Sequence, residues 1–184
     1  MAMTPSNMVP LGTQAPNFSL PDTISGKKYQ LQELKGNKAT VIMFICNHCP
    51  FVIHINKAIV NMANTLQSED VKFIAISSND ANKYPQDGPE NMALHAKKER
   101  YPFPYLYDES QDVAKAYDAA CTPDFYIFDN DLKLTYRGQL DNSRPGNNIE
   151  VTGTDLIHAI GCTTKKSINN KEQKPSIGCN IKWS

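Results

Sequence analysis

The chain has 184 residues, with 19 Lys and Arg against 19 Asp and Glu, so its formal net charge is zero. This balance argues against a strongly basic nucleic-acid binder, because clustered Lys and Arg supply most contacts to phosphates. Hydrophobic residues make up 40% of the chain, which is typical of a globular protein long enough to bury one core. The longest run of large apolar side chains is residues 41–45, far short of the roughly 20 residues that span a bilayer. Neither nucleic acid nor a membrane is therefore an expected partner.

Cysteine usage and the N-terminal residues bear on the cellular compartment. The first basic residue is Lys27, so the chain lacks the charged start of a secretory signal. We therefore expect a cytoplasmic protein whose cysteines rest mainly as thiols. The five cysteines are Cys46, Cys49, Cys121, Cys162 and Cys179. An odd number fits a disulfide framework poorly.

Apolar patterns predict strands that alternate with helices. The first residues are polar and are expected to fray. Residues 15–34 hold short apolar alternations split by Pro21 and by Ser25-Gly26-Lys27, which predict a small N-terminal β element with a hairpin. Residues 39–45 form a continuous apolar run, which predicts a central strand buried on both faces.

Beyond Pro50 the same periodicities continue to the C-terminal region. They predict helices over 50–67, 89–100, 111–119 and 154–160, and strands over 71–77, 105–108, 125–128 and 132–140. This order indicates one α/β domain, with a mostly parallel sheet, helices on both faces and an antiparallel hairpin at one edge. We assign this domain to residues 9–161. Residues 162–184 form a polar, lysine-rich C-terminal extension that ends in an anchoring segment at 177–183.

The motif Cys46-Asn47-His48-Cys49-Pro50 lies where the central strand ends and the long helix begins. Helix N-termini favour thiolates, and the thiolate is the species that attacks a disulfide or a peroxide. Pro50 suits the first helical turn, which has no intrahelical partner for the N–H that proline lacks. A C-x-x-C pair can also be half of a zinc site or two buried core residues. The β-α-β setting favours the redox interpretation.

Several stretches resemble thioredoxin-fold redox proteins: APNFSL, VIMFICNHCP, VKFIAISSND, CTPDFYIFD and LKLTYRGQLD. The chain is more narrowly similar to a bacterial thioredoxin family described as peroxiredoxin-like and related to AhpC/TSA. The resemblance covers most of residues 9–161 and includes the closing SIGCNIKW. It implies a thioredoxin-like fold with a central mixed β-sheet flanked by helices, an N-terminal β element and a C-terminal extension.

The resemblance also implies roles for particular residues. Cys46 would be the exposed nucleophile and Cys49 the buried resolving thiol. Pro123 would be a cis proline opposite the motif, and the backbone of Thr122 would pair with the bound thiol partner. His48 would stabilise the Cys46 thiolate, although a solvent-exposed histidine without a role is also consistent with its position.

The chain departs from both of the patterns it resembles. In peroxiredoxins the cysteine that attacks peroxide corresponds to Cys49, but their arginine falls on Pro123 and their threonine on Cys46. In thioredoxins a buried acid lies on the strand before the motif, yet residues 39–45 contain none. His48 is the candidate substitute base.

The sequence thus predicts a thiol-disulfide oxidoreductase that acts through Cys46 and Cys49, with thiol or disulfide substrates and an upstream thiol reductant. The first alternative is a thiol peroxidase that uses Cys49. The second is a non-enzymatic redox sensor or zinc-binding module. Cys121 and Cys179 are further candidate redox thiols, although a small buried cysteine is the simpler interpretation of Cys121. No nucleotide motif occurs, so no cofactor and no resident metal are expected.

Overall fold

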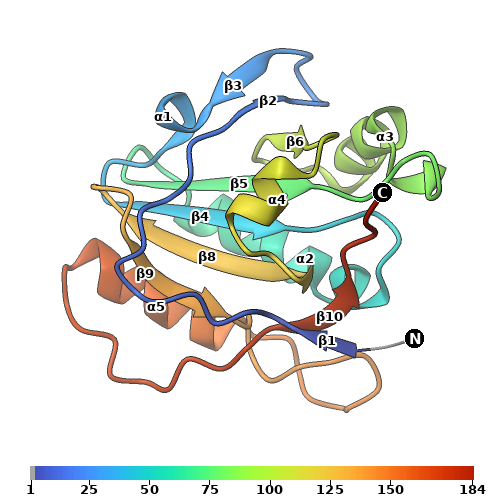
Figure 1. The fold of residues 1–184 in the computed structure, drawn as a ribbon. Helices are drawn as coiled ribbons and strands as arrows, with labels where there is room; N and C mark the ends of the chain where they lie inside the picture. The colour runs from blue at the N-terminus through green and yellow to red at the C-terminus, as the bar shows by residue number, and fades with distance from the viewer. Residues whose placement is uncertain (1–2) are drawn as a thin grey trace.

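The computed structural model describes residues 3–184 (Figure 1). Its strands are β1 (Met3–Pro5), β2 (Ser19–Pro21), β3 (Lys28–Gln30), β4 (Ala39–Phe44), β5 (Val71–Ser77), β6 (Tyr105–Tyr107), β7 (Cys121–Thr122), β8 (Asp124–Asp129), β9 (Leu134–Gly138) and β10 (Ile177–Asn180). Its helices are α1 (Leu31–Leu34), α2 (Pro50–Leu66), α3 (Pro89–Glu99), α4 (Asp112–Ala116) and α5 (Thr154–Thr164), with a short 3-10 helix, η1 (Pro85–Asp87). In the described part of the chain, no helix is long and apolar enough to cross a membrane.

The main sheet has five strands in the order β6-β5-β4-β8-β9, so β4 is the central strand, as predicted. The pairs β4/β5 and β5/β6 are parallel, whereas β4/β8 and β8/β9 are antiparallel. The predicted mixed central sheet flanked by helices is confirmed. Antiparallel pairing reaches the centre of the sheet, however, and is not confined to an edge hairpin.

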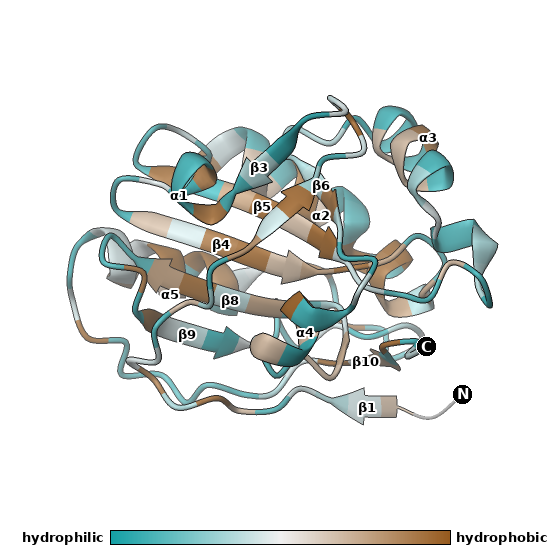
Figure 2. Cartoon of the chain, turned by 45° about the horizontal axis from the view of Figure 1, so that its top comes forward, coloured by the Kyte–Doolittle hydropathy of each residue, from teal (hydrophilic) through white to brown (hydrophobic). Residues whose placement is uncertain are grey.

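Alternation along β4 explains how helices cover both faces of the sheet. Val41 and Met43 belong to the core cluster that includes residues of α2, α3 and α5. Ile42 and Phe44 belong to a second cluster, on the opposite face, which includes residues of α1 and α4. Since successive side chains of a strand point to opposite faces, a strand covered on both sides must be apolar throughout. Figure 2 shows mostly apolar colours along β4 and β5.

The N-terminal β element is confirmed, because β2 and β3 pair antiparallel. Two boundary predictions need correction. The helix predicted to end at residue 160 continues to Thr164, so the proposed domain limit falls within α5. Gly161 does not stop this helix; it ends before Lys166, whose φ is 54°. The side chains of Thr163 and Thr164 hydrogen-bond to carbonyls of the preceding turn.

A second sheet brings the two ends of the chain together beside the motif (Figure 1). β10 lies between β1 and β7 and pairs antiparallel with both. The expectation of fraying is wrong for Met3–Pro5, which form β1, while residues 1 and 2 lie outside the described part. Within the predicted anchor, Ile181 is buried, whereas Trp183 is 39% exposed. The C-terminal strand β10 is held against Thr122 by its backbone pairing with β7.

Close packing of β10 on β7 depends on Gly178. A Cβ atom at this position would lie 1.9 Å from the carbonyl oxygen of Thr122, which is backbone and cannot rotate away. We expect Gly178→Ala to reduce the free energy of unfolding by about 2 kcal/mol or more, as measured by urea denaturation. Gly161→Ala is the matched control, because a Cβ there meets nothing within 4 Å and alanine favours helix by about 1 kcal/mol. Equal stability of the two variants would contradict this packing argument.

Candidate functional site

The motif loop joins the carboxyl end of the central strand to the start of helix α2. Cys46 follows β4 by two residues, Cys49 is the N-cap residue of α2, and Pro50 is in its first turn. The carbonyl of Cys49 accepts hydrogen bonds from the N–H groups of Val52 and Ile53. Because the N-terminal N–H groups of a helix are unsatisfied and carry partial positive charge, this position favours an anionic sulfur. The predicted junction of strand, motif and helix is confirmed.

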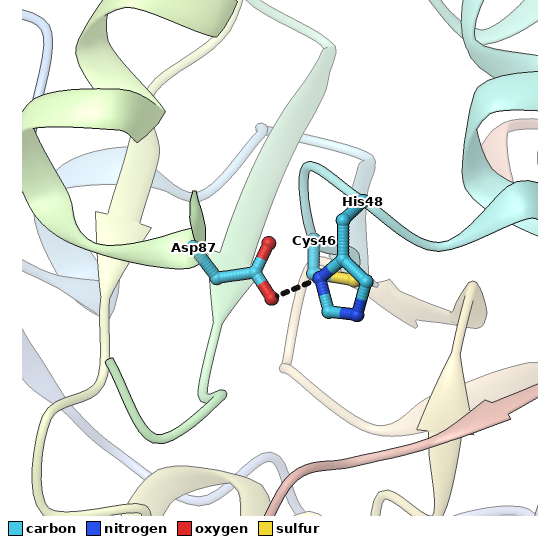
Figure 3. A group of neighbouring side chains, drawn as sticks. All are labelled: Cys46, His48 and Asp87. Carbon is cyan, nitrogen blue, oxygen red and sulfur yellow. Dashed lines mark ion pairs between the residues drawn. The ribbon is translucent and has the colours of Figure 1, made fainter. Parts of the chain in front are cut away.

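Both motif thiols are buried. Cys46 is 1% exposed and Cys49 is inaccessible, so the predicted burial of Cys49 is confirmed, whereas the predicted exposure of Cys46 is wrong. Thr122 from β7 packs against Cys46, with its Oγ1 3.4 Å from Cys46 Sγ. His48 and Asp87 lie beside Cys46 (Figure 3). Of these three neighbours, Asp87 is the one that local sequence did not reveal, because it comes from a distant part of the chain.

The two thiols share one negative charge unequally. The pKa of Cys49 falls from the ordinary 9.0 to about 5, first because the Cys46 thiol donates to it, and further through Cys179 and the backbone N–H of Val52. The pKa of Cys46 is raised by its hydrogen bond to Cys49, by burial and by the negative charge of Asp87. At neutral pH the reduced pair therefore holds one proton, with the thiolate at Cys49.

This distribution predicts an acid-shifted titration. We expect the ultraviolet thiolate absorbance of the reduced protein to rise with a midpoint near pH 5, as the first proton leaves the pair. The reduced protein should also become more stable as pH rises from 5 towards 9.0, because the unfolded chain binds more protons in that range. If the low-pH titration step is lost in Cys49→Ser and retained in Cys121→Ala, that step belongs to Cys49. A first midpoint near 9 would contradict the assignment.

His48 and Asp87 form a polar pair next to Cys46 (Figure 3). The Nδ1 atom of His48 lies 2.5 Å from Oδ2 of Asp87, and the Asp87 side chain is inaccessible to solvent. The imidazole also stacks on Tyr84, with ring centroids 5.7 Å apart and planes 3° from parallel. Because its ring is fixed by contacts from two directions, His48 is not a freely rotating surface histidine.

Asp87 is the site residue that sequence reasoning missed. It lies in η1. Its Oδ1 accepts a hydrogen bond from the backbone N–H of Asn47, and its Oδ2 accepts one from the Nδ2 group of Asn79. The buried acid absent from residues 39–45 is thus supplied by a different segment. A sequence clue existed in Asn79, which follows the adjacent strand at the edge where ligands collect in open sheets. Nothing local marked Asp87 itself.

Asn47 positions the motif loop through hydrogen bonds to other segments of the chain. Its side chain donates to the carbonyl of Gln86 at 2.8 Å and accepts from the Tyr105 hydroxyl at 3.0 Å. Together with the Asn47 N–H bond to Asp87, these contacts fasten the motif to η1 and β6. Asn47 therefore supports the position of the motif loop.

Thr122 and Pro123 lie against the motif as the resemblance implied. The peptide bond between them is cis. The Cys49 sulfur lies 3.2 Å from the Thr122 carbonyl oxygen, to which the protonated thiol would donate. Thr122 thus contacts both motif cysteines, one through its hydroxyl and one through its backbone.

The remaining cysteines have separate environments. Cys179 on β10 places its sulfur 2.9 Å from that of Cys49. Cys121 donates to the carbonyl of Pro123 at 3.6 Å, and burial raises its pKa far above the ordinary range, so it remains a thiol. Cys162 lies inside α5, with its sulfur 3.5 Å from Nε2 of His158. Of the two additional candidates, Cys179 is the one in contact with the motif.

Cys46, His48 and Asp87 could also hold a metal ion, since one ligand atom of each lies within 4.8 Å of the others. Thiolate, imidazole and carboxylate are all donors that zinc accepts. However, two ligands on a tetrahedral zinc are separated by about 3.4 Å at the usual bond lengths. His48 and Asp87 are closer than this, at 2.5 Å, so they would have to move apart to bind zinc. The observed geometry fits a direct polar pair better than a zinc site.

Comparisons with known proteins place the chain in a family. A model of the AhpC/TSA family matches residues 11–137. An uncharacterized conserved protein of Geobacillus kaustophilus is 57% identical, with a TM-score of 0.98 over 100% of this chain and 97% of that chain. A hypothetical protein of Sinorhizobium meliloti is 45% identical, with a TM-score of 0.95 over 98% of each chain. A comparison with curated proteins found no match.

A more distant structure shares the fold alone. A thiol:disulfide interchange protein of the thioredoxin family from Chlorobium tepidum is 17% identical, with a TM-score of 0.64 over 83% of this chain and 97% of that chain. This agrees with the thioredoxin-like architecture described above. Since the family model matches more than half of the residues, the chain belongs to the AhpC/TSA family.

Proposed function

We propose that the protein is a thiol-disulfide oxidoreductase in which Cys46 and Cys49 cycle between a dithiol and a disulfide. The observation that carries this proposal is the placement of both motif cysteines at the start of α2, with each sulfur in contact with Thr122. A sulfur with a depressed pKa is populated as thiolate at neutral pH. The other motif cysteine, three positions away, supplies the second sulfur needed to close a disulfide.

In the proposed cycle, Cys46 attacks after its proton passes to Cys49 along their hydrogen bond. One sulfur of the substrate disulfide then joins Cys46, and the other leaves as a thiolate. Cys49 loses its proton and attacks the Cys46 sulfur, which releases the second substrate thiolate and leaves a Cys46–Cys49 disulfide. Two protein thiols are oxidised and one substrate disulfide is reduced. An upstream thiol reductant then reverses the oxidation of the protein.

The order of attack follows from what surrounds each sulfur. Cys46 lies beside His48, whose side chain is 29% exposed, so this side of the site is nearest to solvent. Cys49 faces inward, against Thr122 and Cys179. We assign the His48–Asp87 pair the role of accepting the proton that Cys49 loses, which replaces the base that the strand lacks.

A thiol peroxidase is the second candidate, and the pKa of Cys49 near 5 is the observation that favours it. A small peroxide could reach a buried thiolate that a protein disulfide could not. Pro123 stands where that chemistry requires an arginine. The guanidinium of Arg137 donates to Val9 and Gln173, and that of Arg144 donates to residues 139, 141 and 143. We therefore rank disulfide exchange first.

The deciding experiment is an equilibrium titration in glutathione buffers, with acid quenching, alkylation and mass spectrometry of every cysteine. We expect a two-electron transition that oxidises Cys49 and leaves Cys121 and Cys162 reduced. A motif that never oxidises would contradict the proposal, and stoichiometric zinc in the isolated protein would favour the metal-binding alternative. Stopped-flow mixing with hydrogen peroxide tests the second candidate. If sulfenic acid forms at Cys49 faster than disulfide exchange occurs, the thiol peroxidase becomes the preferred function.

A further inference from the structure

The sulfur of Cys179 lies 2.9 Å from that of Cys49, closer than the contact between Cys46 and Thr122. Cys179 is 3% exposed and Cys49 is inaccessible, so both sulfurs are enclosed by protein. An S–S bond is about 2.05 Å long, so the sulfurs need to approach by only about 0.9 Å. The Cys49 sulfur is thus within bonding reach of the Cys179 sulfur.

The position of Cys179 is fixed by backbone pairing. In the β10/β7 ladder, Cys179 is the register partner of Thr122, and Cys49 Sγ lies 3.2 Å from the Thr122 carbonyl. Gly178 allows this approach, because any side chain there would meet the same carbonyl. On its other side, β10 is paired with β1, with Met3 opposite Cys179. Two neighbouring strands therefore hold Cys179 at the helix terminus that carries Cys49.

We propose that Cys179 is a third redox-active thiol, which exchanges with the motif disulfide to form a Cys49–Cys179 disulfide. This inference rests on the proposed function, since it needs a Cys46–Cys49 disulfide as its starting point. Burial raises the pKa of Cys179 to about 12, so its thiolate is a minor species, and that thiolate attacks the Cys49 sulfur. The Cys46–Cys49 bond breaks, and Cys46 leaves as a thiolate and takes up a proton. One disulfide is exchanged for another, so no additional oxidant or reductant is required.

The exchange changes what the oxidised protein can do. With the disulfide at Cys46–Cys49, no motif thiol remains to attack a substrate. With the disulfide at Cys49–Cys179, the oxidised protein keeps a nucleophile at Cys46, beside His48 and Asp87. Such a protein can form a mixed disulfide with a substrate disulfide, releasing one substrate thiol, while it still carries its own oxidising equivalent. The C-terminal strand would then be covalently joined to the start of α2.

The first test uses the wild-type chain, so it does not depend on whether a variant folds. Protein oxidised in glutathione buffer is quenched in acid, its thiols are labelled with N-ethylmaleimide, and labelled peptides are quantified. We expect Cys49 to be protected, and the loss of label at Cys179 to be matched by a gain at Cys46. Full labelling of Cys179 with complete protection of Cys46 would overturn this inference while leaving the proposed function intact. Full labelling of all three would instead contradict the proposed function.

Variants supply the second test. Oxidised Cys46→Ala should yield a crosslinked peptide pair joining Cys49 and Cys179. A glutathione adduct on Cys49 should be lost at least ~10-fold more slowly in the Cys46→Ala/Cys179→Ala double variant than in Cys46→Ala. Cys121→Ala is the matched control, because Cys121 is also a buried strand cysteine and should leave the wild-type labelling pattern unchanged. Absence of the crosslink in folded Cys46→Ala, or equal adduct lifetimes, would overturn the inference.

Discussion

Replacing Cys49 with serine is expected to slow the reduction of glutathione disulfide by about a thousandfold or more. The variant loses the thiolate of the pair, whose pKa lies near 5. It also loses the sulfur that closes the disulfide with Cys46 or with Cys179. Single-turnover reduction by the prereduced protein, quenched in acid and followed by mass spectrometry, measures the rate. The expected product is a glutathione adduct that persists on Cys46.

The control for this variant is Cys162→Ser. Cys162 is partly exposed on α5, and its sulfur contacts His158. Its substitution should leave both the exchange rate and the final disulfide unchanged. A Cys49→Ser protein that still reduced glutathione disulfide at the wild-type rate would show that the reaction does not pass through the motif pair.

Replacing Asp87 with asparagine is expected to produce the second largest effect. The carboxylate is fully buried, pairs with His48, and accepts hydrogen bonds from Asn47 and Asn79. Replacing this buried carboxylate weakens the hydrogen bonds that it accepts and leaves a buried polar contact unsatisfied, which costs about 1–3 kcal/mol of folding stability. Because the charge of Asp87 raises the pKa of Cys46, the same variant should lower that pKa. Urea denaturation and the second step of the thiolate absorbance titration measure the two effects.

Asp112→Asn is the matched control for charge removal. The Asp112 side chain is 79% exposed and lies 4.0 Å from Lys115, so its loss should change stability by no more than about 0.5 kcal/mol. Destabilisation of Asp87→Asn without any change in the Cys46 titration would leave Asp87 a purely structural residue. Unchanged stability would contradict the burial argument itself.

The sequence alone determined the central strand and the position of the motif. A strand covered on both faces must be apolar at every position, so β4 was recognisable without knowledge of what covers it. The helical periodicity after Pro50 placed Cys49 at a helix start, because capping and periodicity are local properties. The cis bond before Pro123 was anticipated from resemblance to a family rather than from local physics.

Only the tertiary structure decided the chemistry around the sulfurs. Asp87 reaches His48 from a separate segment, and Cys179 reaches Cys49 from the end of the chain across 130 residues. Burial of Cys46 and the opposite pKa shifts of the two thiols follow from these approaches. Periodicity reports which face of an element is covered but not which distant side chain covers it. Because thiolate stability depends on the charges and donors within a few ångströms, it was decided by contacts between segments far apart in the chain.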